Sequence, residues 1–195
     1  MKKLDPKFRK ALDAAYAHVI SHLENLDNAS VAATADYPTL RKRFAGPLVE
    51  EGVPPEQVVE ELAHGVEGGL LGTSGGRFFG WVIGGSVPAA LAADLMTSGW
   101  EQNAALYACS PAAAVVKEVA GGWLKEILGL PAGASFALVT GCQMAHVTCL
   151  AAARTAVLAK RGWEVERKGL AGAPAIQIYS SDQRHATFER AIRLL

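Results

Sequence analysis

Two short polar segments carry the residue types best suited to chemistry, and each directly follows an apolar run. The first is 140–146, which opens with Thr140 and Gly141 after the run 136–139. A small-residue turn at the start of a helix leaves backbone N–H groups free, and the helix dipole favours an anion there. We interpret this turn as a phosphate site. The alternative is an ordinary strand–turn–helix junction that binds nothing.

The second segment, 180–185, ends in His185 and follows the apolar run 173–179. A histidine at such a position can stack on a flat ligand or act as an acid or base. The alternative is a surface or capping histidine. His146, one turn into the helix after Gly141, either approaches the phosphate or is a satisfied interior histidine. The Gly-x-Gly-x-x-Gly pattern of dinucleotide loops is absent.

The order of elements in the second half predicts how these segments are positioned. A short apolar run at 136–139 precedes a long helix from about 142 to 160, and a second run at 173–179 precedes a final helix. Strand, helix, strand, helix is the pattern of a parallel α/β sheet. In such sheets ligands bind beyond the carboxyl ends of the strands, where both polar segments would lie. The predicted fold class is therefore α/β, with both strand ends pointing the same way.

The first half predicts a helical arm. A helix beginning at Asp5–Pro6 carries one apolar stripe, and a second helix spans 55–68. Glycines then crowd into 65–76, and we place the boundary there, between an arm at 1–70 and a main domain at 71–195. The apolar stripes of the arm predict packing on a partner subunit. His18 and His22 have the spacing of zinc ligands but lack a third, so we expect a solvated helix face and no metal site.

Composition narrows the class of protein. The chain has 195 residues, 19 basic against 19 acidic side chains, 50% hydrophobic residues and 19% charged residues. This balance excludes disorder and argues against nucleic-acid binding. Three cysteines without CxxC spacing indicate reduced thiols in the cytoplasm. The N-terminus lacks the apolar segment of a signal peptide, and the most apolar stretch, 78–96, is broken by Gly, Pro and Asp, so no membrane span is expected.

Seven short blocks in order give the chain a family resemblance from about residue 71 to 195. It resembles the pyridoxal-phosphate-dependent amino-acid decarboxylases of the aromatic amino acid and glutamate decarboxylase group. The resemblance implies the large-domain fold of the aminotransferase superfamily (fold type I), pyridoxal phosphate as cofactor and an amino acid as substrate of a carboxy-lyase. The blocks are Phe78–Val82, Val87–Asp94, Cys109–Ala112, Trp123–Leu124 with Leu130–Pro131, Thr140–Ala145, Leu150–Arg154 and Ser181–His185.

The resemblance also implies roles for single residues. Cys142 and Gln143 match the pair that holds the cofactor phosphate, with Gly141 beside them, and His185 matches the histidine that stacks on the pyridine ring and is the catalytic candidate. Gln143 departs from the small hydroxyl residue common at its position, which removes one side-chain hydrogen bond. Further matches fall in the substrate pocket (Trp81, Val82 and Ile83) and in a segment that approaches the partner subunit's site in such dimers (Asn103 and Tyr107).

Two groups that the resemblance requires are absent from these 195 residues. The family's chemistry needs a lysine that follows a histidine and a carboxylate that holds the pyridine nitrogen protonated. No lysine here follows a histidine, and none lies after His185. We therefore expect the N-terminal portion of a decarboxylase, working as a homodimer or with a complementary C-terminal half. The alternatives are a non-catalytic interaction module of the same fold and, disfavoured by the missing glycines and Tyr-x-x-x-Lys pair, a nucleotide-binding reductase.

Overall fold

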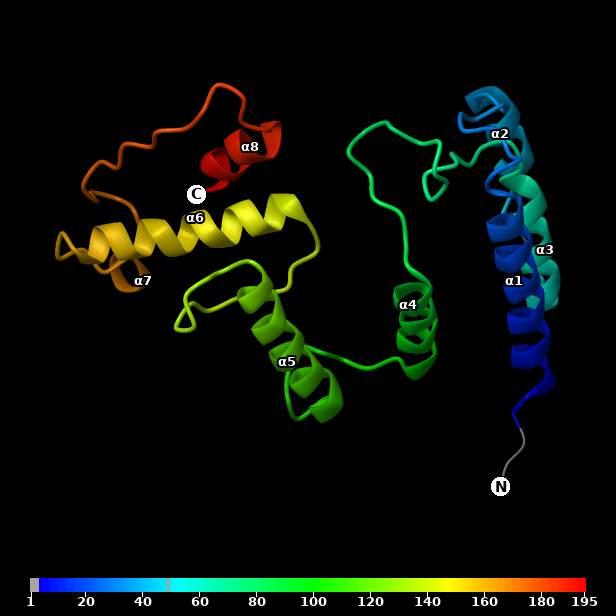
Figure 1. The fold of residues 1–195 in the computed structure, drawn as a ribbon, viewed down its shortest axis with the longest axis horizontal. Helices are drawn as coiled ribbons and strands as arrows, with labels where there is room; N and C mark the ends of the chain where they lie inside the picture. Colours follow the sequence, from blue (N-terminus) through cyan, green and yellow to red (C-terminus); the bar gives the residue numbers. More distant parts are fainter. Residues whose placement is uncertain (1–3, 49) are drawn as a thin grey trace. The chain divides into compact units, whose positions relative to one another are not determined.

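The computed structural model describes residues 4–48 and 50–195, in two compact units, Met1–Trp100 and Glu101–Leu195 (Figure 1). The first unit holds α1 (Pro6–Asn25), α2 (Tyr37–Phe44), α3 (Pro55–Gly65) and α4 (Pro88–Trp100). The second holds α5 (Pro111–Ile127), α6 (Cys142–Ala159), α7 (Val165–Lys168) and α8 (Ala186–Leu194). The predicted boundary at residues 70 and 71 stays a prediction. Residues 1–3, which belong to the N-terminus considered above for a signal peptide, lie outside the described residues.

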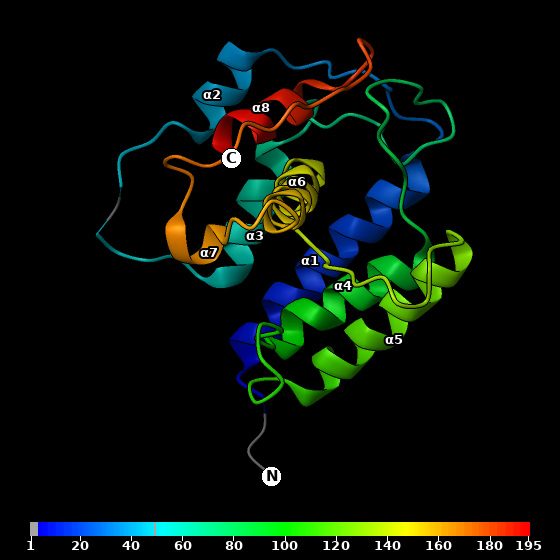
Figure 2. The ribbon, with the colours of Figure 1, turned by 90° about the vertical axis from the view of Figure 1, so that its left-hand side faces the viewer.

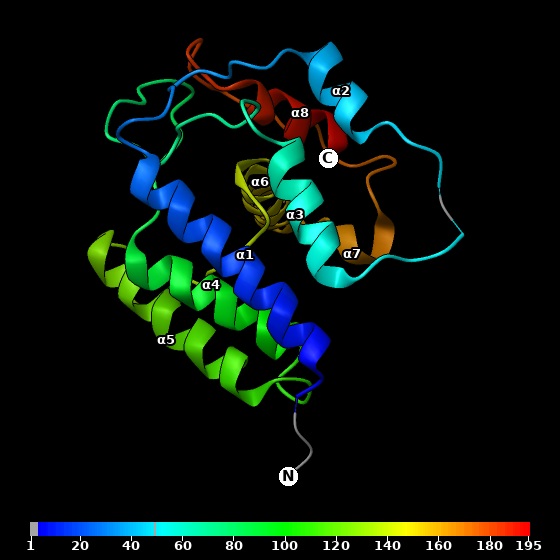
Figure 3. The same cartoon turned by 90° about the vertical axis from the view of Figure 1, so that its right-hand side faces the viewer.

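Helices α1 and α3 lie side by side in the first unit (Figure 1, Figure 3). Asp5 caps α1 by accepting the N–H of Lys7 at 2.9 Å, as the Asp–Pro start predicts. His18 Nε2 lies 2.9 Å from Glu60 Oε2 on α3, so His18 does not lie on a purely solvated face as expected. The arm helices thus pack on each other. Their apolar stripes remain partly open, with the Phe8 side chain 63% exposed.

Helix α2 is tied to the end of α3 by one arginine and one aromatic ring. Arg43 Nη1 donates to the carbonyl oxygen of Gly65 at 3.2 Å and to that of Glu67. These bonds satisfy carbonyls that a helix end leaves without partners. A Cβ at Gly65 would lie 2.6 Å from the Phe44 ring, so glycine is what lets the ring approach α3.

Helix α8 lies beside α6 in the second unit and crosses it at an angle, with α6 seen end-on in Figure 2. Gln143, at the start of α6, donates from Nε2 to the carbonyl oxygen of Thr187 at 3.1 Å. Arg154, three turns further along α6, donates from Nη1 to the carbonyl oxygen of Leu195 at 2.7 Å. Ala191, on the α8 face between these ties, is fully buried. None of the described helices is long and apolar enough to cross a lipid bilayer.

The α/β prediction is not met by this structure, because no strand forms among the described residues. The segments 136–139 and 173–179 leave no ladder hydrogen bonds between them, and Arg161 Nη1 donates to the Ala175 carbonyl oxygen at 3.2 Å instead. Two short strands alone make a marginal sheet, because each gains ladder bonds only from neighbours on its sides.

At Gly121, helix α5 lies close to the Phe136 ring of the extended segment that follows it. A Cβ there would lie 2.0 Å from Cζ of Phe136, whereas a Cβ on neighbouring Gly122 would meet nothing within 4 Å. Glycine to alanine within a helix stabilises by up to about 1 kcal/mol. We expect Gly122→Ala to raise the free energy of unfolding by that amount. Gly121→Ala should instead lower it, since the ring must leave α5 at a cost of about 1–3 kcal/mol.

Urea unfolding followed by circular dichroism measures both variants. Combining each with Phe136→Ala is the control, since removing the ring should make the two glycine positions respond alike. Equal stability of Gly121→Ala and Gly122→Ala in the unmodified background would contradict the packing described.

The start of α2 should depend on pH through Asp36. Hydrogen bonds from the side chain and then the backbone N–H of Thr39 hold the pKa of the Asp36 carboxyl below its ordinary value of 3.8. A lowered pKa in the folded state means that the stabilisation is present above the ordinary value and is lost as pH falls below it. We expect the protection of the α2 amides, relative to their intrinsic exchange rate at each pH, to fall over that window. Asp36→Asn keeps a capping oxygen and should remove the pH dependence. An unchanged pH profile in that variant would contradict the assignment.

Candidate functional site

The N-terminus of α6 presents free backbone donors after a glycine. Gly141 has φ 152° and ψ 178°, a combination essentially restricted to glycine. It caps α6 without any side-chain hydrogen bond, and the first bond of the helix runs from the Ala145 N–H to the Gly141 carbonyl oxygen at 3.0 Å. The N–H groups of residues 142–144 have no acceptor among the described residues. Because a Cβ at Gly141 would meet no protein atom within 4 Å, the backbone angle, not space, is what requires glycine in the protein itself.

His185 is the N-cap of α8 through its side chain. Its Nδ1 accepts the backbone N–H of Thr187 at 3.3 Å and lies 2.8 Å from the Thr187 hydroxyl oxygen. The capping role weighed from the sequence is therefore present. It leaves Nε2 and the faces of the ring outside the cap, so capping and stacking on a ligand are compatible.

The two junctions predicted to share one edge do lie together. We call Cys142, Gln143, His146, His185 and Thr187 the junction cluster. Cys142 Sγ lies 3.9 Å from both ring nitrogens of His146 and 4.0 Å from Thr187 Oγ1. The side-chain amide of Gln143 donates to the Thr187 carbonyl oxygen. The sequence-predicted residues at 141–143 and His185 are thus brought to one place because the first turn of α8 packs against the start of α6.

His146 is half-buried on the α8 side of α6. Its ring meets the Phe188 ring edge-on, with centroids 5.8 Å apart and planes at 87°. This is a favoured aromatic geometry. The contact keeps the His146 ring beside the cluster, while its nitrogens lie near the Cys142 thiol.

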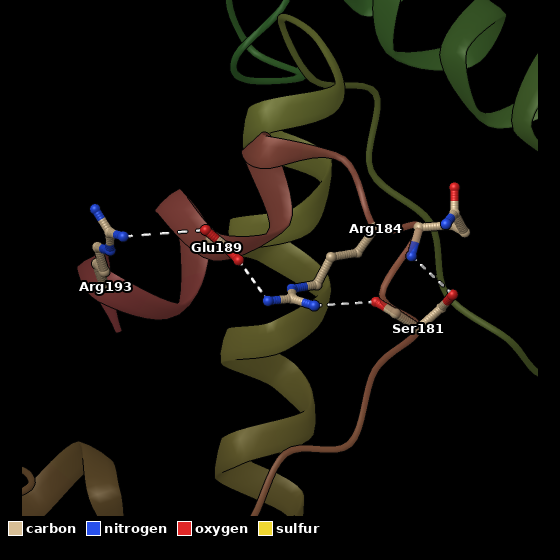
Figure 4. A network of polar contacts seen from close by, with 5 residues as sticks. Ser181, Arg184, Glu189 and Arg193 are labelled. Atoms are coloured by element: carbon tan, nitrogen blue, oxygen red, sulfur yellow. Dashed lines mark hydrogen bonds and ion pairs between the residues drawn. The ribbon is translucent and has the colours of Figure 1, made fainter.

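A polar network braces the loop that delivers His185 (Figure 4). Arg184 donates from Nη1 to the Ser181 carbonyl oxygen at 3.1 Å and from Nη2 to the Glu189 carboxylate. Ser181 Oγ accepts the Gln183 N–H at 3.1 Å, and Arg193 lies 4.0 Å from the other Glu189 oxygen. The network spans the residues on both sides of His185 and so restricts where its ring can go.

Other sequence-predicted residues are not members of the junction cluster. Asn103 and Tyr107 lie in the loop before α5, and no described hydrogen bond or ring contact joins either to the cluster. The Asn103 side-chain oxygen accepts the Ala105 N–H at 3.0 Å instead. The three residues assigned to the substrate pocket belong to the first unit: Trp81, Val82 and Ile83.

Two of these pocket residues have strained backbone. Trp81 has φ 63° and Val82 has φ 54°, and the side chains are 82% and fully exposed respectively. The left-handed region is a genuine outlier for a β-branched residue. Strain of this kind persists where the surroundings or a function require it, so the segment stays a functional candidate.

Sequence reasoning missed Thr187. It touches Cys142, Gln143 and His185, and it lies at the second position of α8. The available signal was its spacing, because a side chain at the N-cap meets the backbone N–H two or three residues later. The sequence gives a capping role for His185 as an alternative, but it does not name the residue that the cap engages.

A hollow in the second unit lies away from the junction cluster. It measures about 490 Å³ and lies between α6, the segment 170–179 and the end of α8. It is the apolar space beside the segment predicted to be a strand, whereas the junction cluster lies at the helix starts, with Cys142 and His185 exposed and its other members half-buried.

Comparison with known proteins confirms the resemblance inferred from the motifs. No family model matches the chain. Homologues are aromatic-L-amino-acid, tryptophan and tyrosine decarboxylases. The aromatic-L-amino-acid decarboxylase of Bacillus atrophaeus is 27% identical over 177 residues, which cover 91% of this chain and 35% of that protein.

Solved structures show the fold of the same group. Mouse CSAD superposes with a TM-score of 0.85 at 18% identity over 98% of this chain and 40% of its own. Catharanthus roseus tryptophan decarboxylase in complex with L-tryptophan gives a TM-score of 0.77 at 20% identity over the full chain and 40% of its own. The chain therefore shares the fold of a portion of these proteins and spans well under half their length.

Proposed function

Because the chain is homologous to a portion of the amino-acid decarboxylases, we propose that it is a segment of a pyridoxal-phosphate-dependent carboxy-lyase that acts on an amino acid. The carrying observation is that the uncapped start of α6 and the ring of His185 lie together at the junction cluster. The comparisons support the family, and the cluster supports the role of this segment within it.

The residues present fit the phosphate of the cofactor. Three consecutive N–H groups at the start of an 18-residue helix provide donors and a positive dipole end for an anion. No carboxylate belongs to the junction cluster to oppose that charge. The Gln143 amide is engaged with Thr187, so in this proposal the phosphate is held by backbone donors from 142 to 144.

The ring of His185 would provide the stacking surface. Its cap to Thr187 holds the ring at the edge of α6, and the loop network around Arg184 limits its movement. When bound, pyridoxal phosphate supplies the conjugated ring that accepts the electron pair released as carbon dioxide leaves. The chain's own residues bind and orient that ring and do not themselves move the electron pair.

The remaining parts of the active site are proposals about the whole protein. The lysine and the carboxylate that the chemistry needs would come from sequence other than these 195 residues. The same additional sequence would supply neighbours for 136–139 and 173–179 and complete an α/β sheet of fold type I. In the assembled enzyme, working as a homodimer or with a complementary half, Trp81, Val82 and Ile83 would line the substrate pocket, and Asn103 and Tyr107 would approach the partner subunit's site.

We place the protein in the cytoplasm. All three cysteines are free, and each is exposed. Exposed unpaired thiols persist in a reducing compartment and are oxidised or paired outside it.

The binding proposal is tested by equilibrium dialysis of the 195-residue chain with pyridoxal phosphate and with pyridoxal, which lacks the phosphate. We expect tighter binding of the phosphorylated form. Gln143→Glu should weaken pyridoxal phosphate about tenfold, or 1.4 kcal/mol, because the new carboxylate repels the anion, and should weaken pyridoxal less, since only the lost tie to Thr187 affects that form. Gln177→Glu is the matched control, since it makes the same charge change on the segment 173–179, where Gln177 Oε1 accepts the Tyr179 hydroxyl.

Equal affinity for the two forms, or equal effects of the two glutamate variants, would overturn the phosphate assignment.

In the same solutions the chain should release no carbon dioxide from an added aromatic amino acid, because it lacks the lysine. Release of carbon dioxide by the chain alone would contradict the proposal that the activity needs additional sequence.

A further inference from the structure

Thr187 contacts side chains at both parts of the proposed cofactor site, the start of α6 and the ring of His185. Its hydroxyl oxygen lies 2.8 Å from His185 Nδ1 and 4.0 Å from Cys142 Sγ, and its carbonyl oxygen accepts the Gln143 amide at 3.1 Å. We propose that Thr187 is a positioning residue that fixes the tautomer and orientation of the His185 ring relative to the N-terminus of α6. The part of this role that concerns the cofactor rests on the proposed function.

The direction of the hydrogen bonds follows from what each group is able to donate. The backbone N–H of Thr187 donates only, so His185 Nδ1 must present its lone pair. A neutral imidazole then carries its hydrogen on Nε2. The Thr187 hydroxyl, 2.8 Å from the same lone pair, also donates to it. Two donors from one residue thus select one tautomer and define the plane of the ring.

The single hydrogen of the Thr187 hydroxyl is used in this bond. In its contact with Cys142, Oγ1 therefore accepts and the thiol donates. The result is a directed chain from the Cys142 thiol through the Thr187 hydroxyl to His185 Nδ1. It connects the first residue of α6 to the ring at the start of α8.

The position of Thr187 is itself fixed by α6. Gln143 Nε2 holds the Thr187 carbonyl oxygen, and Thr187 is only partly exposed. The orientation of the His185 ring is therefore fixed relative to α6, which also carries the proposed phosphate donors. A glutamine at 143, in place of the small hydroxyl residue of the resembling family, makes this tie possible because its longer side chain reaches across to α8.

The tautomer is tested on the unliganded 195-residue chain with 15N-labelled histidine, by long-range proton–nitrogen correlation spectra at a pH where the rings are neutral. We expect His185 to be a single tautomer with hydrogen on Nε2, whereas His22, exposed on α1, serves as the reference for an unrestrained ring. Thr187→Val should move the His185 nitrogen shifts toward those of His22. Thr187→Ser, which keeps the hydroxyl, should restore them.

Cofactor binding provides the second readout. Thr187→Val should weaken pyridoxal phosphate about fivefold, the equivalent of one hydrogen bond of about 1 kcal/mol, and leave inorganic phosphate binding unchanged. Thr187→Ser should bind like the unmodified chain. Thr148→Val is the matched control, because Thr148 is an exposed threonine on α6 outside the junction cluster, and it should change neither readout.

Hydrogen on Nδ1 of neutral His185 in the unmodified chain would overturn the proposal, and this measurement needs no variant to fold. Unchanged His185 shifts in Thr187→Val, or the same loss in Thr187→Ser, would also overturn it. If the unmodified chain binds no pyridoxal phosphate, the proposed function fails, while the ring spectra still decide the role of Thr187.

Discussion

The attachment of α8 to α6 at both of its ends decides where the chemistry-bearing residues of the second unit lie. Gln143 holds the start of α8 through the Thr187 carbonyl, and Arg154 holds its end through the Leu195 carbonyl. Between these ties the small, fully buried Ala191 lets the helices approach closely. Because α8 is held at both ends by side chains of α6, it can occupy only one register along that helix. In this register the starts of α6 and α8 meet.

That meeting of helix starts concentrates two kinds of binding group. The start of α6 offers backbone donors that favour an anion, and the start of α8 is capped by an imidazole. The common N-cap side chains are Ser, Thr, Asp and Asn. A histidine in this role brings a flat ring to the same edge as the anion donors. An arrangement suited to a phosphorylated aromatic ligand thus follows from ordinary helix-end chemistry at two neighbouring termini.

The described residues bury little of their apolar surface. Large side chains such as Phe79, Trp123 and Tyr179 are more than half exposed, while full burial is reached at few positions such as Leu158. The segments 136–139 and 173–179 are extended without ladder partners. Burial of apolar surface is the main favourable term in folding. The chain spans 35% to 40% of the compared relatives, so these exposed faces belong to only a portion of the fold that those relatives have.

The sequence by itself determined the helices, their caps and the family. Proline and aspartate starts, 3.6-residue periodicity and the ordered blocks from 78 to 185 are local signals. Helices α1, α6 and α8 formed where they were predicted, and α3 begins as predicted but ends at Gly65. Tertiary structure alone decided the rest. It paired His18 with Glu60, left two predicted strands without a sheet, and made Thr187 the contact between both helix starts. Those outcomes depend on which residues far apart in the sequence come within contact distance in space. A local sequence pattern does not specify such contacts.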